Sequence, residues 1–306
     1  MGRAGSSMSG KKLPGMDTFA DKLKRFVIYP LAYLTWFTGI TSTLIRMVSR
    51  HPGVIVLNYH RINERTDAKA GGYTENITSV ANLNKHVDYL KKHFSFITPD
   101  GLLSYLTGQR EIKGVQILLT FDDGYKDTYQ FGLPVLRRHE LPAIIFVTTG
   151  ILNSTFVLPA DRYVESADNG AGSSPQSCDA LYLNSEDIRD IQSLGLQIGS
   201  HTVTHPVLAE LSLQDQEMEI ASSRNKLEEF TLSPVRFFSY PIGKTSRETP
   251  HLVQRTGYQM AFGNRRGYIT RGADRFDLPR LSACNHPVPV LAFKIVMTKL
   301  FQWIHP

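Results

Sequence analysis

The chain is 306 residues long, with 42% hydrophobic and 20% charged residues and a formal net charge of +6. This composition is that of a globular protein and excludes fibrous repeats and wholly disordered chains, while the length suits one α/β barrel or two small domains. Much of the basic excess lies near the N-terminus, at Lys11, Lys12, Lys22, Lys24 and Arg25. No dense basic patch with interleaved aromatic residues follows, so we expect no nucleic-acid partner.

The first predicted element is an apolar helix. Residues Phe26 to Ile45 form a run of 20 without a charge, which is about the length that crosses a bilayer. Pro30, Gly39 and several Ser and Thr residues lower its hydropathy, so a helix that lies on the barrel or on a membrane surface is the alternative to a spanning one. We expect membrane association, with residues 1–50 forming a basic N-terminus and a membrane-associated helix.

The basic cluster ahead of this segment predicts an orientation. Positive residues beside a spanning segment stay in the cytoplasm, which would put the remaining chain on the outer side of an inner membrane. Arg46 and Arg50 follow the segment and weaken that bias, so the cytoplasmic face is the alternative. We therefore expect an inner-membrane association with an extracytoplasmic domain.

From residue 54 onward, short β-branched or aliphatic runs alternate with segments of helical period, as in βα units around a parallel sheet. Seven strands are predicted: Val54–Tyr59, Val115–Phe121, Ala143–Thr148, Leu196–Ser200, Val235–Tyr240, Tyr258–Phe262 and Leu278–Ser282. Apolar residues at helical spacing, such as Leu83, Val87 and Leu90, indicate amphipathic helices between them. The fold class is therefore α/β, a seven-stranded (β/α) barrel over residues 51–306 with an N-terminal apolar helix.

Three other features complete the chain. Residues Glu165–Ala180 are polar, rich in Gly, Ser and Ala and without period, which predicts a surface loop inserted in the barrel. Residues Val288 to Ile304 are apolar apart from two lysines, which predicts a helix packed on the barrel or on a membrane. Cys178 and Cys284 are too few for a disulfide scaffold, although one bridge between them stays open.

Two predicted strands end in residues that can bind a metal. Asp-Asp-Gly at 122–124 follows the strand at 115–121, and His-Thr-Val-Thr-His at 201–205 follows the strand at 196–200. The reactive groups of parallel α/β barrels collect at these strand ends. Two imidazoles and one carboxylate suit zinc with an open position for water, which is the ligand set of a catalytic site and not of a structural one.

The pair of aspartates offers a second role. Neighbouring residues at a strand end point in different directions, so one carboxylate can bind the metal while the other takes a proton from an attacking water. Asp and Gly also dominate turns for local reasons, and a simple turn is the alternative for Asp-Asp-Gly taken alone. The His-x-x-x-His sequence after another strand favours the metal site.

His60 ends the first predicted strand, so we expect it to open on the same face. An imidazole there can donate a proton to a departing amine, whereas a hydrogen-bonded structural histidine is the alternative. Other histidines, such as His51, His86, His93 and His139, have no comparable setting. We expect them at surface or capping positions.

These residues resemble the motifs of the polysaccharide deacetylase family, the carbohydrate esterases (family 4) that share the NodB homology domain. Thr-Phe-Asp-Asp-Gly-Tyr at 120–125 looks like the first motif, Ser-His-Thr-Val-Thr-His-Pro at 200–206 like the second, and Ser-Tyr-Pro-Ile-Gly at 239–243 like the third. The likeness extends from about residue 52 to 285. It implies an irregular (β/α) barrel of seven strands, with Asp123, His201 and His205 as metal ligands and Asp122 as general base.

The resemblance also implies that the third motif serves the substrate: the backbone N–H of Ile242, with Tyr240 beside it, would hold the oxyanion of a tetrahedral intermediate.

The chain departs from the family's motifs at two places. The third motif usually begins with an arginine that orients the base, where this chain has Ser239. The usual histidine motif near the C-terminus is not recognisable, since no leucine-rich strand leads into His286.

The exopolysaccharide deacetylases that act on poly-N-acetylglucosamine resolve both departures, and this chain looks like that subgroup. Its members carry a Tyr-His near the N-terminal strand that serves as the acid, and Tyr59-His60 matches it. Leu278-Pro279-Arg280 similarly resembles the segment that supplies a late arginine. The resemblance therefore implies His60 as the catalytic acid and Arg280 as the residue that orients Asp122.

The expected function is metal-dependent hydrolysis of the N-acetyl amide of amino sugars in a polysaccharide. The resemblance and the ligand set imply Zn²⁺, with Co²⁺, Ni²⁺ or Mn²⁺ as alternatives. The expected partners are an N-acetylated polysaccharide or glycolipid and a membrane. Two alternatives stay open, namely a deacetylase of a lipid-linked sugar or lipopolysaccharide precursor, and a carbohydrate-binding pseudoenzyme.

Overall fold

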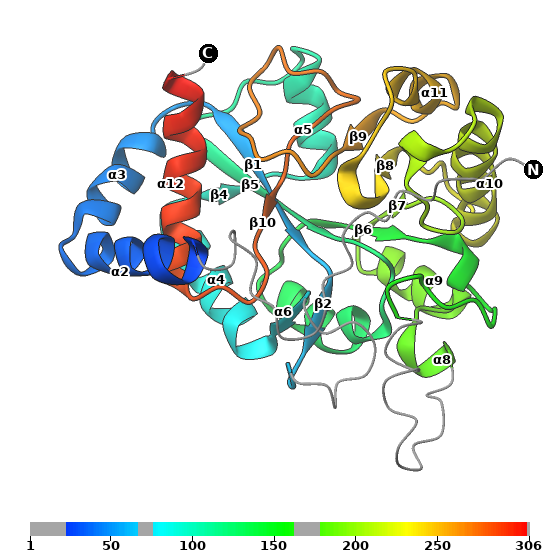
Figure 1. Cartoon of the computed structure of the whole chain (residues 1–306), viewed down its shortest axis with the longest axis horizontal. Coiled ribbons are helices and arrows are strands. Elements are labelled where there is room, and N and C mark those ends of the chain that lie inside the picture. The colour runs from blue at the N-terminus through cyan, green and yellow to red at the C-terminus, as the bar shows by residue number, and fades with distance from the viewer. Residues whose placement is uncertain (1–22, 67–75, 162–177, 305–306) are drawn as a thin grey trace, which may run out of the picture.

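The computed structural model describes residues 23–66, 76–161 and 178–304, and a curled parallel sheet forms its centre (Figure 1). All seven predicted strands are present, several shorter than expected, in the order β10-β1-β5-β6-β7-β8-β9. Their bounds are β1 (Gly53–Tyr59), β5 (Val115–Phe121), β6 (Ala143–Val147), β7 (Gln197–Ser200), β8 (Phe237–Ser239), β9 (Met260–Phe262) and β10 (Leu281–Ser282). Each neighbouring pair is parallel, as the βα alternation predicted.

The two ends of this sheet come together irregularly. Phe262, the last residue of β9, forms a parallel bridge with Leu278, three residues ahead of β10. The N–H of Gly263 also donates to the carbonyl of Leu278 at 2.9 Å. A short strand, β4 (Ser95–Phe96), pairs with the beginning of β5, and β2 (Arg61–Asn63) pairs with β3 (Ile77–Ser79) beyond the end of β1. The predicted irregular seven-stranded barrel is confirmed.

Helices surround the sheet (Figure 1). They are α4 (Val80–His93), α5 (Pro99–Leu106), α6 (Leu133–Arg138), α9 (Ser185–Ser193), α10 (Leu213–Thr231), α11 (Thr249–Arg255) and α12 (Val288–Ile304), with short turns η3 (Thr128–Gly132), η4 (Thr149–Ile151), η5 (Leu208–Glu210) and η6 (Pro241–Gly243). The periodic residues Leu83, Val87 and Leu90 form the buried face of α4. Asn184 caps α9 with a complete capping box, because its side chain and that of Asp187 each accept the other's backbone N–H.

The predicted N-terminal apolar helix is two helices and not one. Its residues form a π-helical turn η1 (Lys24–Ile28), then α2 (Tyr29–Phe37) and α3 (Ile40–Val48). Gly39 between them has φ of +76°, a left-handed conformation that ends α2 and turns the chain. Both helices lie beside α12, whose bounds match the sequence prediction (Figure 1). None of the helices within the described ranges combines the length and the apolar composition that a membrane crossing requires.

Two other predictions have partial outcomes. Most of the expected loop at 165–180 lies outside the described residues, and its last residues belong to a short helix, α8 (Cys178–Leu181). Cys284 carries a free thiol, so the structure contains no bridge from it to Cys178. The expected division of the chain at residue 50 stays a prediction.

Side chains alternate between two clusters along the strands. Ile55, Leu57 and Tyr59 of β1 belong to the cluster that lies under the outer helices. Val54 and Val56 belong to a second cluster with the inward residues of the other strands and with Leu102 and Tyr105 of α5. Because both faces of a parallel sheet are covered, every residue of β1 is buried.

Candidate active site

The inner face of the barrel changes from apolar to polar toward the carboxyl ends of its strands. The positions that continue the inward alternation are Asn58 after Val56, Thr120 and Asp122 after Leu118, Ser239 after Phe237, and Arg280 after Leu278. All five are buried, with at most 3% of each exposed. The period of two in the strands thus brings polar groups from four separate segments to one end of the barrel.

Arg280 and Asp122 form the most closely fitted pair at this end. The guanidinium Nη1 lies 2.8 Å from Oδ1 of Asp122, and Nη2 lies 2.7 Å from Oδ2. Arg280 is itself held by the carbonyl of Gly263, to which its Nε donates at 2.9 Å, and by Oδ1 of Asn264 at 3.1 Å. A bidentate pair fixes both the position and the plane of the carboxylate.

Two neighbouring side chains complete the surroundings of Asp122. The amide of Asn58 donates to Oδ2 at 3.1 Å, and the Ser239 hydroxyl accepts from Nη2 of Arg280 at 2.9 Å. Burial alone would raise the pKa of Asp122, but the charge of Arg280 and the nearby His201 outweigh it and hold the pKa below its ordinary value. The carboxylate is therefore ionised although it is buried.

The expected metal ligands lie together beside this pair. Oδ1 of Asp123 is 3.4 Å from Nε2 of His201 and 3.3 Å from Nε2 of His205, and the three atoms lie within 4.8 Å of one another. Oδ1 is buried and has no hydrogen-bond partner among the described residues. Atoms about 2.1 Å from one ion at tetrahedral angles lie about 3.4 Å apart, so this spacing fits a zinc-like centre.

The loop that carries the two histidines is held in an uncommon conformation. Thr202 and His205 both have positive φ, +68° and +59°. Nδ1 of His201 lies 2.7 Å from the carbonyl of Ser239, which leaves Nε2 free to face Asp123. Burial would raise the pKa of Asp123, but the imidazoles of His201 and His205 outweigh it and hold the pKa well below its ordinary value.

Glu219 on α10 fixes this loop from behind. Its Oε2 accepts from the backbone N–H groups of Val203 and Thr204 at 2.8 and 3.0 Å, and its Oε1 accepts from the Thr204 hydroxyl at 2.7 Å. The sequence analysis did not identify this residue. A signal was present, since Glu219 lies on the buried face of α10, where an unpaired carboxylate would be costly.

His60 lies at the end of β1, close enough to Asp122 and Asp123 to lower the pKa of both carboxylates. Its carbonyl accepts from the Thr128 hydroxyl at 2.7 Å, which fixes the backbone there. Nδ1 is buried and has no hydrogen-bond partner in the part of the chain that the structure describes. The ring is partly exposed and is not tied into a structural hydrogen bond through Nδ1.

The third motif has a strained backbone. Ile242 has φ of +60° and ψ of −8°, a left-handed conformation that a β-branched residue rarely adopts, and its side chain is 52% exposed. Tyr240 differs from the expectation that it serves the substrate. Its ring is buried and its hydroxyl donates to the carbonyl of Phe276 at 2.8 Å, so the side chain is part of the core.

The expectation for His86 was wrong. This residue is fully buried, with Nδ1 3.0 Å from the Tyr59 hydroxyl and Nε2 2.6 Å from the carbonyl of His286. Burial lowers the pKa of His86 to about 4. Its position at i+3 from Leu83 on an amphipathic helix was the signal that it faces inward. His286 contacts Tyr29 of α2, where their Nδ1 and hydroxyl atoms lie 2.9 Å apart.

Comparison with known sequences agrees with these motifs. The family model for polysaccharide deacetylases matches residues 109–261, which contain the whole Asp/His/His cluster. A protein of Bacillus subtilis (strain 168), provisionally named polysaccharide deacetylase YxkH, is 26% identical over 197 residues. That match covers 64% of this chain and 62% of the relative, so the chain spans less than two thirds of that relative's length.

Solved structures share the fold. The deacetylase PplD of Streptococcus pyogenes, in complex with acetate, has a TM-score of 0.64 and 20% identity and covers 81% of this chain and 98% of its own. IcaB of Ammonifex degensii has a TM-score of 0.62 and 21% identity over 82% of this chain and 98% of its own.

Proposed function

The chain belongs to the polysaccharide deacetylase family, and from that premise we propose that it removes acetyl groups from N-acetylated amino sugars of a polysaccharide. One observation carries the proposal: a buried carboxylate, Asp122, is held by Arg280 directly beside the Asp123, His201 and His205 cluster. Binding a metal needs only one of the two aspartates. The second, ionised and oriented, is what a hydrolytic reaction requires.

The ligand set suits Zn²⁺, and Co²⁺, Ni²⁺ or Mn²⁺ also accept such ligands. A divalent ion supplies Lewis acidity, which activates water and polarises an acyl carbonyl. The chain's own part is to hold His201 through the Ser239 carbonyl and the loop at 201–205 through Glu219. These bonds keep the ligand atoms converging before any ion arrives.

Asp122 takes the proton of the attacking water, and Arg280 fixes the carboxylate for that transfer. The backbone N–H of Ile242, presented by its left-handed conformation, donates to the oxygen that becomes negative in the tetrahedral intermediate. His60, beside both carboxylates, gives a proton to the sugar nitrogen as the C–N bond breaks. One water is consumed, and a free amine and acetate are formed.

The substrate class is part of the proposal. The Tyr59-His60 and Arg280 positions favour a poly-N-acetylglucosamine type of exopolysaccharide, through the resemblance of these motifs to that subgroup. PplD, which shares the fold, was solved in complex with acetate, the carboxylate that this reaction would release. A lipid-linked amino sugar is the second candidate, favoured by the exposed apolar residues of α2 and α3.

The test is an acetate-release screen with the purified chain and added Zn²⁺. We expect release from N-acetylglucosamine oligomers, with the new amines counted in the same samples. Faster release from lipid-linked N-acetylated sugars than from any oligomer would transfer the proposal to the second candidate. The contrary result is a protein that holds one metal per chain and binds the oligomers but releases acetate from no acylated sugar. That result would contradict the proposal and favour a carbohydrate-binding pseudoenzyme.

A further inference from the structure

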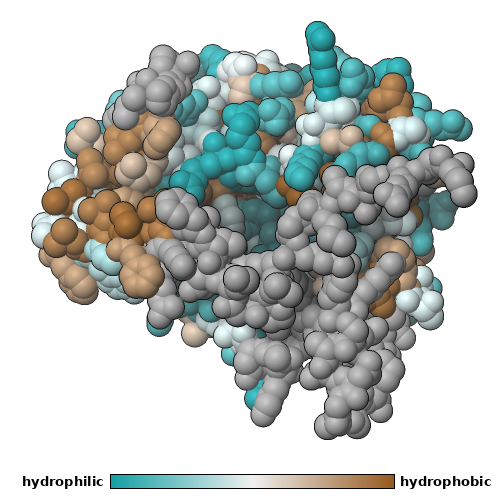
Figure 2. All heavy atoms as spheres, in the orientation of Figure 1, coloured by the Kyte–Doolittle hydropathy of each residue, from teal (hydrophilic) through white to brown (hydrophobic). Residues whose placement is uncertain are grey.

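An exposed apolar surface covers the two N-terminal helices. Phe26, Val27, Leu31, Leu34, Phe37 and Ile40 all expose at least 43% of their surface. Figure 2 shows hydrophobic residues gathered on this side of the molecule, over the place that α2 and α3 occupy in Figure 1. We call these six residues the N-terminal apolar surface. Solvated helices normally place polar residues on such a face.

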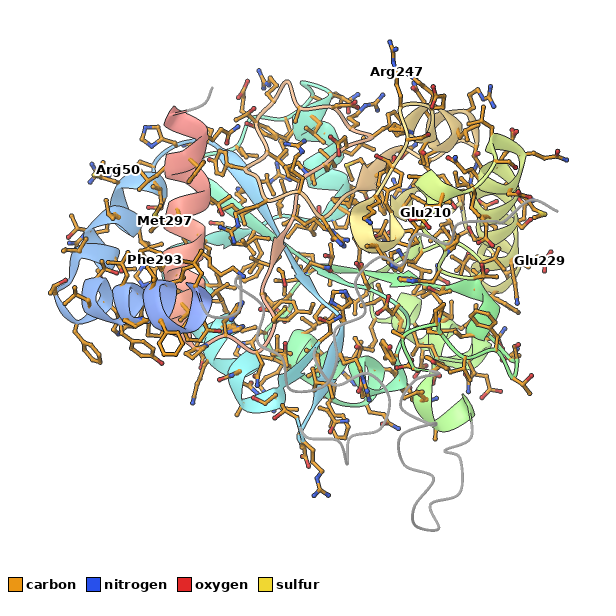
Figure 3. All side chains as sticks on the ribbon, in the orientation of Figure 1. Arg50, Glu210, Glu229, Arg247, Phe293 and Met297 are labelled. Carbon is orange, nitrogen blue, oxygen red and sulfur yellow. The ribbon has the colours of Figure 1, made fainter. Side chains whose placement is uncertain are left out.

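This surface is not the face by which the helices pack on the protein. The buried residues of α2 and α3 are others, namely Ala32, Thr41, Ile45 and Val48. Both helices contact α12, and Figure 3 shows Phe293 and Met297 on the side of α12 that faces them. The helices therefore have one apolar face inside the protein and a second one outside it.

The charged residues of the segment that carries this surface have one sign. The sequence contains no Asp or Glu between Lys22 and Asn63. Residues 22–50 contain five basic residues, Lys22, Lys24, Arg25, Arg46 and Arg50, so five positive and no negative charges give this segment +5 of the chain's +6. Arg46 and Arg50 are exposed, and Figure 3 places Arg50 at the outer edge of the molecule. A segment that combines an exposed apolar face with basic residues and no acidic ones has the composition of a helix that lies in an anionic membrane interface.

We propose that the N-terminal apolar surface docks flat into the interface of a bilayer that contains anionic lipids. Lipid fits better than a second copy of the chain. A symmetric dimer through this surface would bring the same basic segment of both copies together, with ten positive charges in two segments that contain no acidic residue. Anionic headgroups meet the same charges with opposite sign.

The docked helices are tied to the active-site strand. The hydroxyl of Tyr29, which begins α2, lies 2.9 Å from Nδ1 of His286. The His286 carbonyl contacts His86, and His86 contacts the Tyr59 hydroxyl at the end of β1, next to His60. Phe26 and Val27, which belong to the N-terminal apolar surface, lie three and two residues ahead of Tyr29 in the sequence. Docking would thus hold the carboxyl end of β1 near the lipid surface. This position suits an acylated sugar that is presented at a membrane, whichever polymer or lipid carries the sugar.

The experiment uses the full chain and sedimentation with vesicles of phosphatidylcholine alone or mixed with phosphatidylglycerol. We expect binding to the anionic vesicles, weakened by added salt. The double variant Leu34→Ser/Phe37→Ser should bind them roughly tenfold or more weakly, because two exposed side chains no longer enter the interface. The matched control is Leu213→Ser/Met218→Ser, which changes two residues of α10 that are 52% and 58% exposed and should bind like the wild type.

A second variant isolates the charge. Arg46→Gln/Arg50→Gln should lose most of the preference for anionic over neutral vesicles. Each variant should release acetate from a soluble oligomer at the wild-type rate, which separates lost docking from a lost fold and from failure of the proposed reaction. The proposal would be overturned if the wild-type protein did not sediment with either type of vesicle. If the wild type is instead a dimer without lipid, and Leu34→Ser/Phe37→Ser converts that dimer to a monomer, the surface serves self-association and the lipid proposal is wrong.

Discussion

At the scale of single residues, the site depends on a pair that the sequence separates by 158 positions, Asp122 and Arg280. Ser239 stands where the family's arginine is usual, and in this structure its small side chain instead accepts a hydrogen bond from Nη2 of Arg280. The guanidinium therefore reaches Asp122 from the segment just ahead of β10 and not from β8. A resemblance suggested this, whereas strand alternation alone places Arg280 on the inner face without saying which carboxylate it meets.

Arg280→Lys keeps the charge but cannot form the two-pronged contact. We expect kcat to fall roughly 100-fold with little change in KM, because a misplaced base slows the reaction more than it weakens substrate binding. Steady-state kinetics on an N-acetylglucosamine oligomer measures this, with the melting temperature as the check on folding. Wild-type kcat in a well-folded Arg280→Lys protein would show that the bidentate contact between residue 280 and Asp122 is not needed.

Glu219 holds the backbone of the loop at 201–205 and forms its hydrogen bonds with Val203 and Thr204, not with the side chain of an expected metal ligand. Glu219→Gln keeps the shape but removes the charge that three N–H and O–H groups share. We expect Zn²⁺ affinity to fall about tenfold, measured by competition with a coloured chelator. Glu217→Gln, on the exposed side of the same helix, is the matched control. Equal affinities in the two variants would mean that the loop holds its shape without Glu219.

At the scale of elements, local pattern predicted the strands well because each short buried run is bounded by its own turn residues. The strand at Val115–Phe121 and the helix at Val288–Ile304 have the predicted bounds. The N-terminal segment was predicted as one helix because hydropathy was summed across Gly39, whose positive φ divides it. His86 was misjudged because its partners, Tyr59 and the His286 carbonyl, come from distant segments that no local pattern joins.

The buried His86 on α4 predicts a pH dependence of stability. Its pKa falls from 6.5 unfolded to about 4 folded, so the unfolded chain binds the extra proton between those values. Above pH 6.5 His86 is neutral in both states, and its burial costs no stability. As the pH falls toward 4, the unfolded chain takes up a proton that the folded chain does not, so the free energy of unfolding is about 2 kcal/mol lower at pH 5 than at pH 7. Urea unfolding at both pH values should show this difference shrinking in His86→Gln but not in His251→Gln, a change at an exposed histidine. An equal loss in both variants would assign the pH dependence to other groups.

In the complete fold, the barrel brings the site together, and residues 22–50 carry five of the six net positive charges. Strand order and the loops that follow β1, β5 and β7 bring His60 and Asp122 to the expected metal ligands, and Arg280 reaches the same place from the segment just ahead of β10. The sequence indicated this because barrel sites follow strand ends. It could not indicate which face of α2 and α3 is covered, since that depends on packing against α12. The extracytoplasmic placement of the barrel stays a prediction, which protease added to intact cells would check.

We propose that Asp122 acts as the base beside a metal that it does not bind. The most direct measurement is the Asp122→Asn protein, assayed for bound metal and for acetate release in the same preparation. We predict one metal per chain, as in the wild type, with turnover reduced roughly 1,000-fold or more. Near-normal turnover, or loss of the metal together with the activity, would contradict the claim.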